Sequence, residues 1–288
     1  MRTETEMLSL IKKVALEDEN IRAAYMEGSR TNPNVPKDIF QDYDIVYLVE
    51  TTKPFREDKE WINRFGTILY MQYPEDNVFY PSDVENCYGW QIQLADGNRI
   101  DLHVCTKEYV FANLELYRIL VDKDGMMPPP QETTDERYWV KKPKELEFQS
   151  SYSDFWWCLN NVAKGLWRNE IPYVMDMINF AVRPELMRLL EWKIGVENHF
   201  SVSAGKSGKY MKKYLSEKEY KQFLATYPMA DIELIWDSVF TMCDLFQSTA
   251  VELSKKMGFA YDYKMAENSL HFLQHVKELP SDAQEIYP

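Results

Sequence analysis

The hydrophobic pattern of this chain changes its period partway along, and this change limits the fold more than any other feature. Before residue 128, apolar residues fall in short runs such as YDIVYLVE at 43–50 and RIDLHV at 99–104, which predict strands. Beyond a polar stretch that follows three consecutive prolines, they recur at the spacing of amphipathic helices. We therefore expect an α+β fold, with a mixed sheet and flanking helices in residues 1–145 and an all-α helical bundle in residues 146–288.

Three further elements are predicted in the first half. Thr3 and Glu6 have the spacing of a capping box at the start of an amphipathic helix. The dipeptide Asp96-Gly97 between two apolar runs predicts a tight hairpin turn. Residues 56–71 are predicted to form one helix packed on the sheet, because helical spacing places the following residues on one face: Trp61, Ile62, Phe65, Ile68 and Leu69.

Charge and composition exclude several classes of protein. The chain has 33 basic and 46 acidic residues and a net charge of −13, which repels a phosphate backbone and attracts cations, so no nucleic-acid partner is expected. It shows neither an export signal nor an apolar stretch near the roughly 20 residues of a membrane helix, so we expect a cytoplasmic protein without a membrane partner. The four cysteines form no C-x-x-C pair and have no His-rich partner segment, which favours reduced thiols over a zinc site or disulfides.

Three aspartates and a Gly-Ser step carry the chemistry. Asp42 and Asp44 open an apolar strand and point to the same face, because side chains alternate along a strand. Asp101 lies on a second predicted strand, and it would join them if the two strands pair. Crowded carboxylates are costly without a cation, and Mg²⁺ prefers oxygen ligands and triphosphates. The Gly28-Ser29 turn leaves backbone N–H groups and a hydroxyl free to approach a phosphate, which completes a predicted site for magnesium and a triphosphate.

This arrangement resembles the nucleotidyltransferase superfamily related to DNA polymerase beta, with its Gly-Ser turn, its D-x-D pair and a later acidic residue on an adjacent strand. Longer segments resemble the aminoglycoside 6-adenylyltransferases, namely EGSRTNPN at 27–34, QDYDIVYLV at 41–49, DGNRIDL at 96–102, FWWCLNNVAKGLWRNEIPY at 155–173 and GKSGKYMKKYL at 205–215. The resemblance implies transfer of AMP from Mg-ATP to the 6-hydroxyl of streptomycin, with release of pyrophosphate and inactivation of the antibiotic. The acidic balance fits such a cationic acceptor.

The resemblance also implies a role for each aspartate. Asp42 and Asp44 would hold magnesium, and Asp101 would be the general base, also touching the metal. From the residues themselves, Arg30 is placed for a phosphate beside Gly28 and Ser29, and the basic turn with Lys206 and Lys209 for the β- and γ-phosphates. The candidates for binding the acceptor are one aromatic and three acidic residues of the helical half: Trp157, Asp154, Glu170 and Asp176.

Two other functions remain open from the sequence. One is a nucleotidyltransferase that acts on another acceptor, such as a hydroxyl of a protein or a nucleic acid. The full helical second half and the lack of a basic groove argue against it. The other is a non-catalytic nucleotide-binding module, although all three aspartates are present. Neither pattern nor charge fixes the oligomeric state, for which a monomer is favoured.

Overall fold

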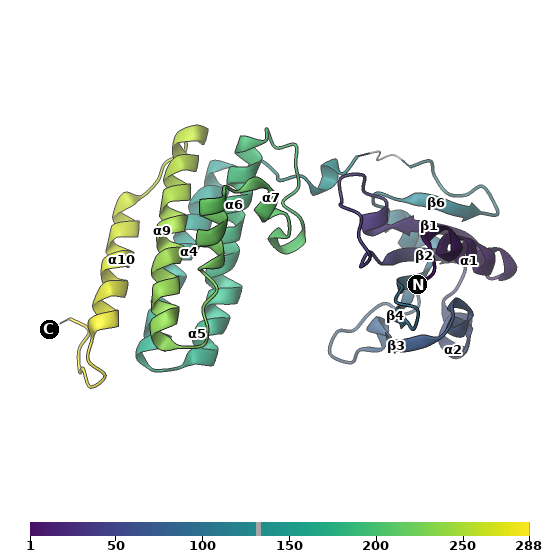
Figure 1. Ribbon diagram of the computed structural model, residues 1–288, viewed down its shortest axis with the longest axis horizontal. Helices are drawn as coiled ribbons and strands as arrows, with labels where there is room; N and C mark the ends of the chain where they lie inside the picture. Colours follow the sequence, from purple (N-terminus) through teal and green to yellow (C-terminus); the bar gives the residue numbers. More distant parts are fainter. Residues whose placement is uncertain (131–133, 288) are drawn as a thin grey trace. The chain divides into compact units, whose positions relative to one another are not determined.

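The chain forms two compact units, Met1–Asp135 and Glu136–Pro288. The structure, a computed structural model, describes residues 1–130 and 134–287 (Figure 1). The first unit is built on a sheet, and the second consists of helices. The α+β fold predicted from the change of hydrophobic period is therefore confirmed. The expected boundary near residue 145 falls at the first residue of helix α4, Glu145–Trp167.

Within the described residues, the first unit contains a six-stranded sheet with the order β3-β4-β5-β2-β1-β6. The strands are β1 Ile21–Glu27, β2 Tyr43–Val49, β3 Ile68–Gln72, β4 Cys87–Leu94, β5 Arg99–Thr106 and β6 Arg118–Asp122. The central pair, β2 and β5, is parallel, and the neighbouring pairs are antiparallel. Strands β4 and β5 form the predicted hairpin, in which Gly97 has a positive φ of 93° and Asp96 accepts a hydrogen bond from the Asn98 N–H.

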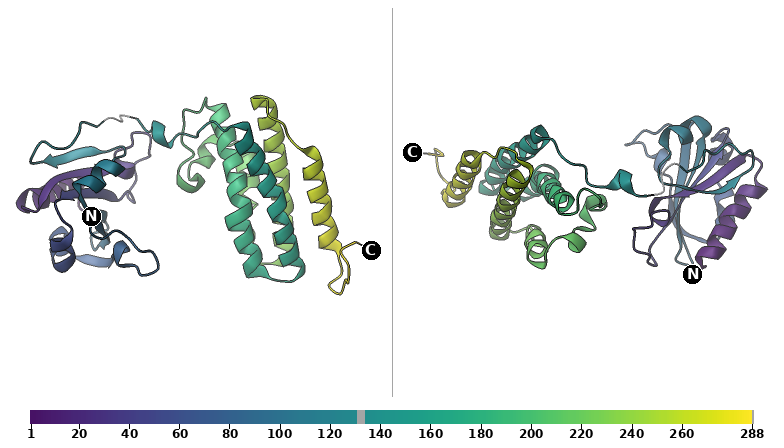
Figure 2. Two further views of the ribbon diagram at one scale, coloured as in Figure 1. Left: turned by 180° about the vertical axis from the view of Figure 1, so that it is seen from behind. Right: turned by 90° about the horizontal axis from the view of Figure 1, so that it is seen from above.

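One face of the sheet carries the larger core of this unit. Helix α1, Glu4–Glu17, begins with the predicted capping box of Thr3 and Glu6 and packs Met7 and Ile11 against this face (Figure 2). From β2 the alternate residues Tyr43, Ile45, Tyr47 and Val49 point into this core. The hydroxyl of Tyr47 donates a 2.7 Å hydrogen bond to the Ile11 carbonyl, so a buried polar group is satisfied where helix and sheet meet.

The prediction of a single helix over residues 56–71 is wrong. This stretch contains the end of α2, Lys53–Glu57, then the 3₁₀ turn Trp61–Phe65, then strand β3. Gly66 follows the turn with a φ of 122°, a backbone conformation that glycine adopts readily and a helix does not contain. Trp61, Ile62 and Phe65 are buried as the helical spacing predicted, but Leu69 lies on the edge strand and is 65% exposed.

On the opposite face of the sheet, the short helix α3, Lys107–Asn113, packs through its buried residue Val110. The small core there takes its residues from several strands and loops: Ala23, Tyr25, Val46, Leu48, Cys87, Cys105, Tyr117 and Met127. Beyond this core, the same alternation of side chains places polar residues on this face, from the start of β2 and β5 and the end of β1. The candidate site lies there.

The second unit is the predicted helical bundle, in which α4, α6, α9 and α10 run alongside one another (Figures 1 and 2). Its further elements are α5 Ile171–Met177, a π-helical turn Ile178–Val182, α6 Arg183–Glu197, α7 Met211–Tyr214, α8 Glu217–Leu224, α9 Ile232–Met257 and α10 Tyr263–Glu278. Buried Lys193 on α6 pairs with carboxylates of Glu197, Glu219 and Glu252, which ties α6 to α8 and α9. No helix in the described part of the chain is long and apolar enough to cross a membrane.

Candidate active site

The three aspartates singled out in the sequence lie together on one face of the sheet. Strands β2 and β5 run parallel with Asp44 directly opposite Asp101, and Asp42 lies two residues earlier, just before β2. One carboxylate oxygen from each of the three lies within 4.8 Å of the others, and all three side chains are partly buried. Parallel pairing of the two acidic strands therefore produces the convergence that the sequence predicted.

The Gly28-Ser29 step lies against this acidic group. Gly28 opens a 3₁₀ turn, Gly28–Arg30, with a φ of 71°. A Cβ at position 28 would be 1.9 Å from Oδ2 of Asp44, so only glycine allows the turn to approach the carboxylate so closely. The Ser29 hydroxyl accepts a long hydrogen bond of 3.5 Å from the Gln41 side chain. The turn that was predicted to hold phosphate is thus adjacent to the predicted metal ligands.

The site concentrates negative charge. Burial, together with the neighbouring carboxylates of Asp42, Asp101 and Glu27, raises the pKa of Asp44 to about 7. Burial likewise raises the pKa of Glu27 to about 7, together with the charge of Glu115. A divalent cation among these carboxylates would remove the repulsion, and a set of carboxylate oxygens is the donor set that Mg²⁺ prefers. The residues present therefore fit a magnesium ion.

Arg99 supplies a positive charge to the same group. Its guanidinium binds Asp101 with two hydrogen bonds, 2.9 Å from Nε to Oδ1 and 2.6 Å from Nη2 to Oδ2, and its Nε lies 3.8 Å from Oδ2 of Asp42. The Arg99 side chain is 46% exposed, and these contacts hold its guanidinium beside the aspartates. It orients Asp101 and offsets part of the charge.

Arg30, predicted to contact a phosphate, makes structural contacts in this protein. Its guanidinium donates 2.8 Å hydrogen bonds to the carbonyls of Gln41 and Asp42, and it lies over the Tyr43 ring at 3.9 Å. These contacts fix the start of β2 and therefore the position of Asp42. Binding of nucleotide by Arg30 stays a prediction.

The remaining predicted residues belong to the second unit. Asp154 and Trp157 lie one turn apart on α4, and both are exposed, with Trp157 at 68%. Glu170 precedes α5 and Asp176 lies on it, and both are exposed. Lys206 and Lys209 are exposed on and beside a 3₁₀ turn, Lys206–Gly208. All six side chains are accessible to a ligand, and their roles stay predictions.

Glu27 was missed by the sequence reasoning. It is the last residue of β1 and pairs with Asp44 across the antiparallel β1–β2 ladder, which brings a fourth carboxylate to the site. Strand alternation offered a signal, because Glu27 shares a face with Ala23 and Tyr25 and directly precedes Gly28. The pairing register that places it opposite Asp44 could not be read from the sequence.

A mixed sheet that brings three carboxylates to a Gly-Ser turn, followed by a helical unit, has the features of a nucleotidyltransferase. Comparison with known proteins identifies the family within this class. The family model for streptomycin adenylyltransferase matches residues 1–276. The aminoglycoside 6-adenylyltransferase of Bacillus subtilis (strain 168) is 39% identical over 267 residues, covering 91% of this chain and 93% of that protein. Its counterpart from Staphylococcus aureus is 37% identical over 265 residues, covering 91% and 94%.

Among solved structures, that of an aminoglycoside 6-adenyltransferase from Bacillus subtilis covers 97% of this chain and 100% of its own, at 33% identity and a TM-score of 0.48. Since the family model spans nearly the whole sequence and the curated relatives exceed 30% identity over most of their length, the chain belongs to the streptomycin adenylyltransferase family.

Proposed function

We propose that this protein transfers AMP from Mg-ATP to the 6-hydroxyl of streptomycin, releasing pyrophosphate and inactivating the antibiotic. The observation that carries the proposal is the convergence of Asp42, Asp44 and Asp101 beside the Gly28 turn. Membership of the streptomycin adenylyltransferase family supports the choice of nucleotide and acceptor. The net charge of −13 agrees with a strongly cationic acceptor.

Each residue of the site has a defined task in this reaction. Asp42 and Asp44 would hold magnesium, which neutralises charge on the triphosphate and on the leaving pyrophosphate. The backbone of the Gly28-Ser29 turn, in which Gly28 carries no side chain of its own, binds phosphate oxygens through its N–H groups. Glu27 has no proposed contact with substrate. Its negative charge beside Asp44 adds to the affinity of the site for cations.

Asp101 is proposed to act on the acceptor, and its position on β5, beside the strand that carries Asp44, supports a role separate from that of Asp42 and Asp44. It takes the proton from the acceptor hydroxyl, whose oxygen forms a bond to the α-phosphorus as the bond from that phosphorus to the bridging oxygen breaks. The electron pair of the broken bond leaves with pyrophosphate. Arg99, which binds both oxygens of Asp101, fixes the direction in which the carboxylate faces.

The exposed acidic residues of the second unit are proposed to bind the guanidinium groups of the acceptor. Asp154, Glu170 and Asp176 are accessible, and Trp157 offers an aromatic surface beside Asp154. Lys206 and Lys209 are proposed to contact the β- and γ-phosphates.

The proposal is tested by mass spectrometry of streptomycin incubated with the protein, ATP and Mg²⁺. The expected product is streptomycin carrying one AMP unit, with pyrophosphate in equal amount and no product in excess chelator. Unmodified streptomycin in the presence of bound nucleotide would instead favour a different acceptor or a non-catalytic nucleotide-binding module. Undiminished transfer in excess chelator would rule out the metal-dependent mechanism.

A further inference from the structure

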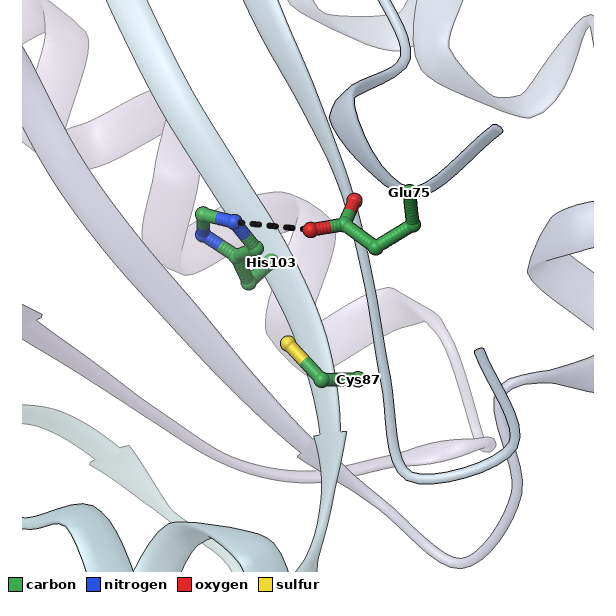
Figure 3. A group of neighbouring side chains, drawn as sticks. All are labelled: Glu75, Cys87 and His103. Carbon is green, nitrogen blue, oxygen red and sulfur yellow. Dashed lines mark ion pairs between the residues drawn. The ribbon is translucent and has the colours of Figure 1, made fainter. Parts of the chain in front are cut away.

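A second group of potential metal ligands lies on the same sheet face as the aspartates, and no part of the AMP transfer uses it. Glu75, Cys87 and His103 each present one ligand atom, and these atoms all lie within 4.8 Å of one another (Figure 3). The three residues come from the 3₁₀ turn Pro74–Asp76, from β4 and from β5. Cysteine spacing gave no sign of such a site, because sheet pairing and a turn assemble it from distant parts of the chain.

The β4–β5 hairpin positions two of the ligands. Cys87 is paired with Cys105, and Gly89 is paired with His103, so the side chains at 87 and 103 are diagonal neighbours on one face. A Cβ at position 89 would be 2.4 Å from Cδ2 of His103. Glycine at this position therefore leaves the space in which the imidazole lies over the β4 backbone.

The third ligand is held by the edge of the sheet. Strand β3 pairs with β4 only as far as Gln72 and Gln91, and the N–H of Gly89 beyond this ladder donates a 2.8 Å hydrogen bond to Oε2 of Glu75. The other oxygen, Oε1, faces Nε2 of His103 at 3.8 Å. This distance is too long for a hydrogen bond and close to the roughly 3.4 Å between two ligands of one tetrahedral zinc ion.

The sulfur of Cys87 is held by its neighbour in the sheet. The Cys105 thiol donates a hydrogen bond to it at a distance of 3.2 Å, the kind of outer contact that orients a metal ligand. Cys105 is the more deeply buried of the two, at 2% exposure against 9%. The His103 side chain is 30% exposed, so an ion can reach the group from solvent.

We propose that Glu75, Cys87 and His103 form a second cation site, specific for a borderline-soft divalent ion such as zinc and separate from the magnesium site of the three aspartates. Sulfur, imidazole nitrogen and one carboxylate oxygen form a donor set that suits Zn²⁺ and disfavours Mg²⁺. The hydrogen bond from Gly89 orients the Glu75 carboxylate in the way that outer contacts orient metal ligands. Three protein ligands leave the fourth position of a tetrahedral ion open.

Titration of Co²⁺ into the reduced, metal-free full-length protein tests the site, because only a cobalt ion bound to a thiolate gives a sulfur-to-cobalt charge-transfer absorption. We expect this absorption to saturate at one Co²⁺ per chain, to persist in excess Mg²⁺ and to disappear when Zn²⁺ displaces the cobalt. Asp42→Asn should leave it unchanged. The absence of charge-transfer absorption in the wild-type protein would overturn the proposal.

Variants identify the ligands. Cys87→Ser should abolish the absorption, whereas Cys158→Ser, which removes a thiol of the second unit, should retain it. Glu75→Gln keeps an acceptor for the Gly89 N–H and should weaken Zn²⁺ binding by at least about tenfold, as should His103→Gln. Full absorption in Cys87→Ser would contradict the assignment.

A measurement on the wild-type protein does not depend on whether these variants fold. Zn²⁺ should slow alkylation of Cys87 by an added reagent, as followed by peptide mass spectrometry, and should leave the alkylation of Cys158 unchanged. Equal rates of Cys87 alkylation with and without Zn²⁺ would overturn the proposal as well.

Discussion

At the scale of single residues, the site is governed by the cost of gathering carboxylates on a half-buried sheet face. Asp44 bears a large part of this cost, because it is partly buried and lies between Glu27 on β1 and Asp101 on β5. Its pKa is raised to about 7, so the folded protein holds a proton there that the unfolded chain has already lost. The stability of the metal-free protein should therefore fall as pH rises from about 4 to about 7 and then level off.

The substitution Asp44→Asn should remove the contribution of Asp44 to this pH dependence and leave that of Glu27, whose pKa is also raised to about 7, while it abolishes AMP transfer. At pH 8 without metal, we expect the variant to be more stable than the wild type by about 1–2 kcal/mol, since solvent screens part of the repulsion at a partly exposed group. Urea unfolding at pH 5 and pH 8 in chelator measures the effect. Asp244→Asn, at an exposed position of α9, is the control and should change stability by less than about 0.5 kcal/mol. Near-normal turnover in Asp44→Asn would show that Asp44 takes no part in the reaction.

Substitution of Asp101 should affect turnover and nucleotide binding differently from substitution of Asp42. A positioned general base contributes about 10²–10⁴-fold to a rate, whereas metal ligands also govern nucleotide binding. We therefore expect Asp101→Asn to lower turnover by that range and to leave the affinity for Mg-ATP within a few fold of normal. Calorimetric titration of Mg-ATP into Asp42→Asn and Asp101→Asn compares them. If both lose nucleotide binding equally, Asp101 is mainly a metal ligand and the base lies elsewhere.

At the scale of elements, local sequence patterns predicted the strands and the helix start that depend on neighbouring residues alone. The alternation in YDIVYLV and RIDLHV was sufficient to place Asp44 and Asp101 on strands, and the capping residues marked the start of α1. The stretch 56–71 was misassigned because three buried residues matched a helical period, although Gly66 ends the turn and an edge strand follows. The pairing register between distant strands places Glu27 beside Asp44, and it places Cys87 near His103. No local sequence pattern encodes such pairing.

The turn between β1 and β2 offers a test at this scale. Gly28→Ala should reduce AMP transfer by at least about 10²-fold, because the new Cβ would displace Asp44, whose Oδ2 is 1.9 Å from its position. Gly125 has a similar positive φ of 63° but nothing within 4 Å of a Cβ. Gly125→Ala therefore shares the backbone strain of about 1–2 kcal/mol and should keep full activity. Equal activity of the two variants would show that the close approach at Gly28 is not needed.

At the scale of the whole molecule, the excess of acidic residues should act on the acceptor over a longer range than any single contact. The net charge of −13 attracts a polycation, and salt screens this attraction with a Debye length of about 10 Å at 0.1 M. We expect the affinity for streptomycin to fall by about tenfold or more between about 0.02 M and about 0.5 M salt, as measured by calorimetry.

The same experiment can separate the effect of the overall negative charge on affinity from the effect of the proposed acceptor-binding residues. The triple variant Asp154→Asn, Glu170→Gln and Asp176→Asn removes three exposed charges of the second unit and should leave the fold intact, since these side chains are on its surface. If they bind the guanidinium groups directly, the variant should bind streptomycin more weakly than the wild type at low salt, because three ion pairs are lost. An unchanged affinity in the triple variant would assign the attraction to the remaining acidic surface. An affinity of the wild-type protein that does not vary with salt would contradict electrostatic recognition of the acceptor altogether.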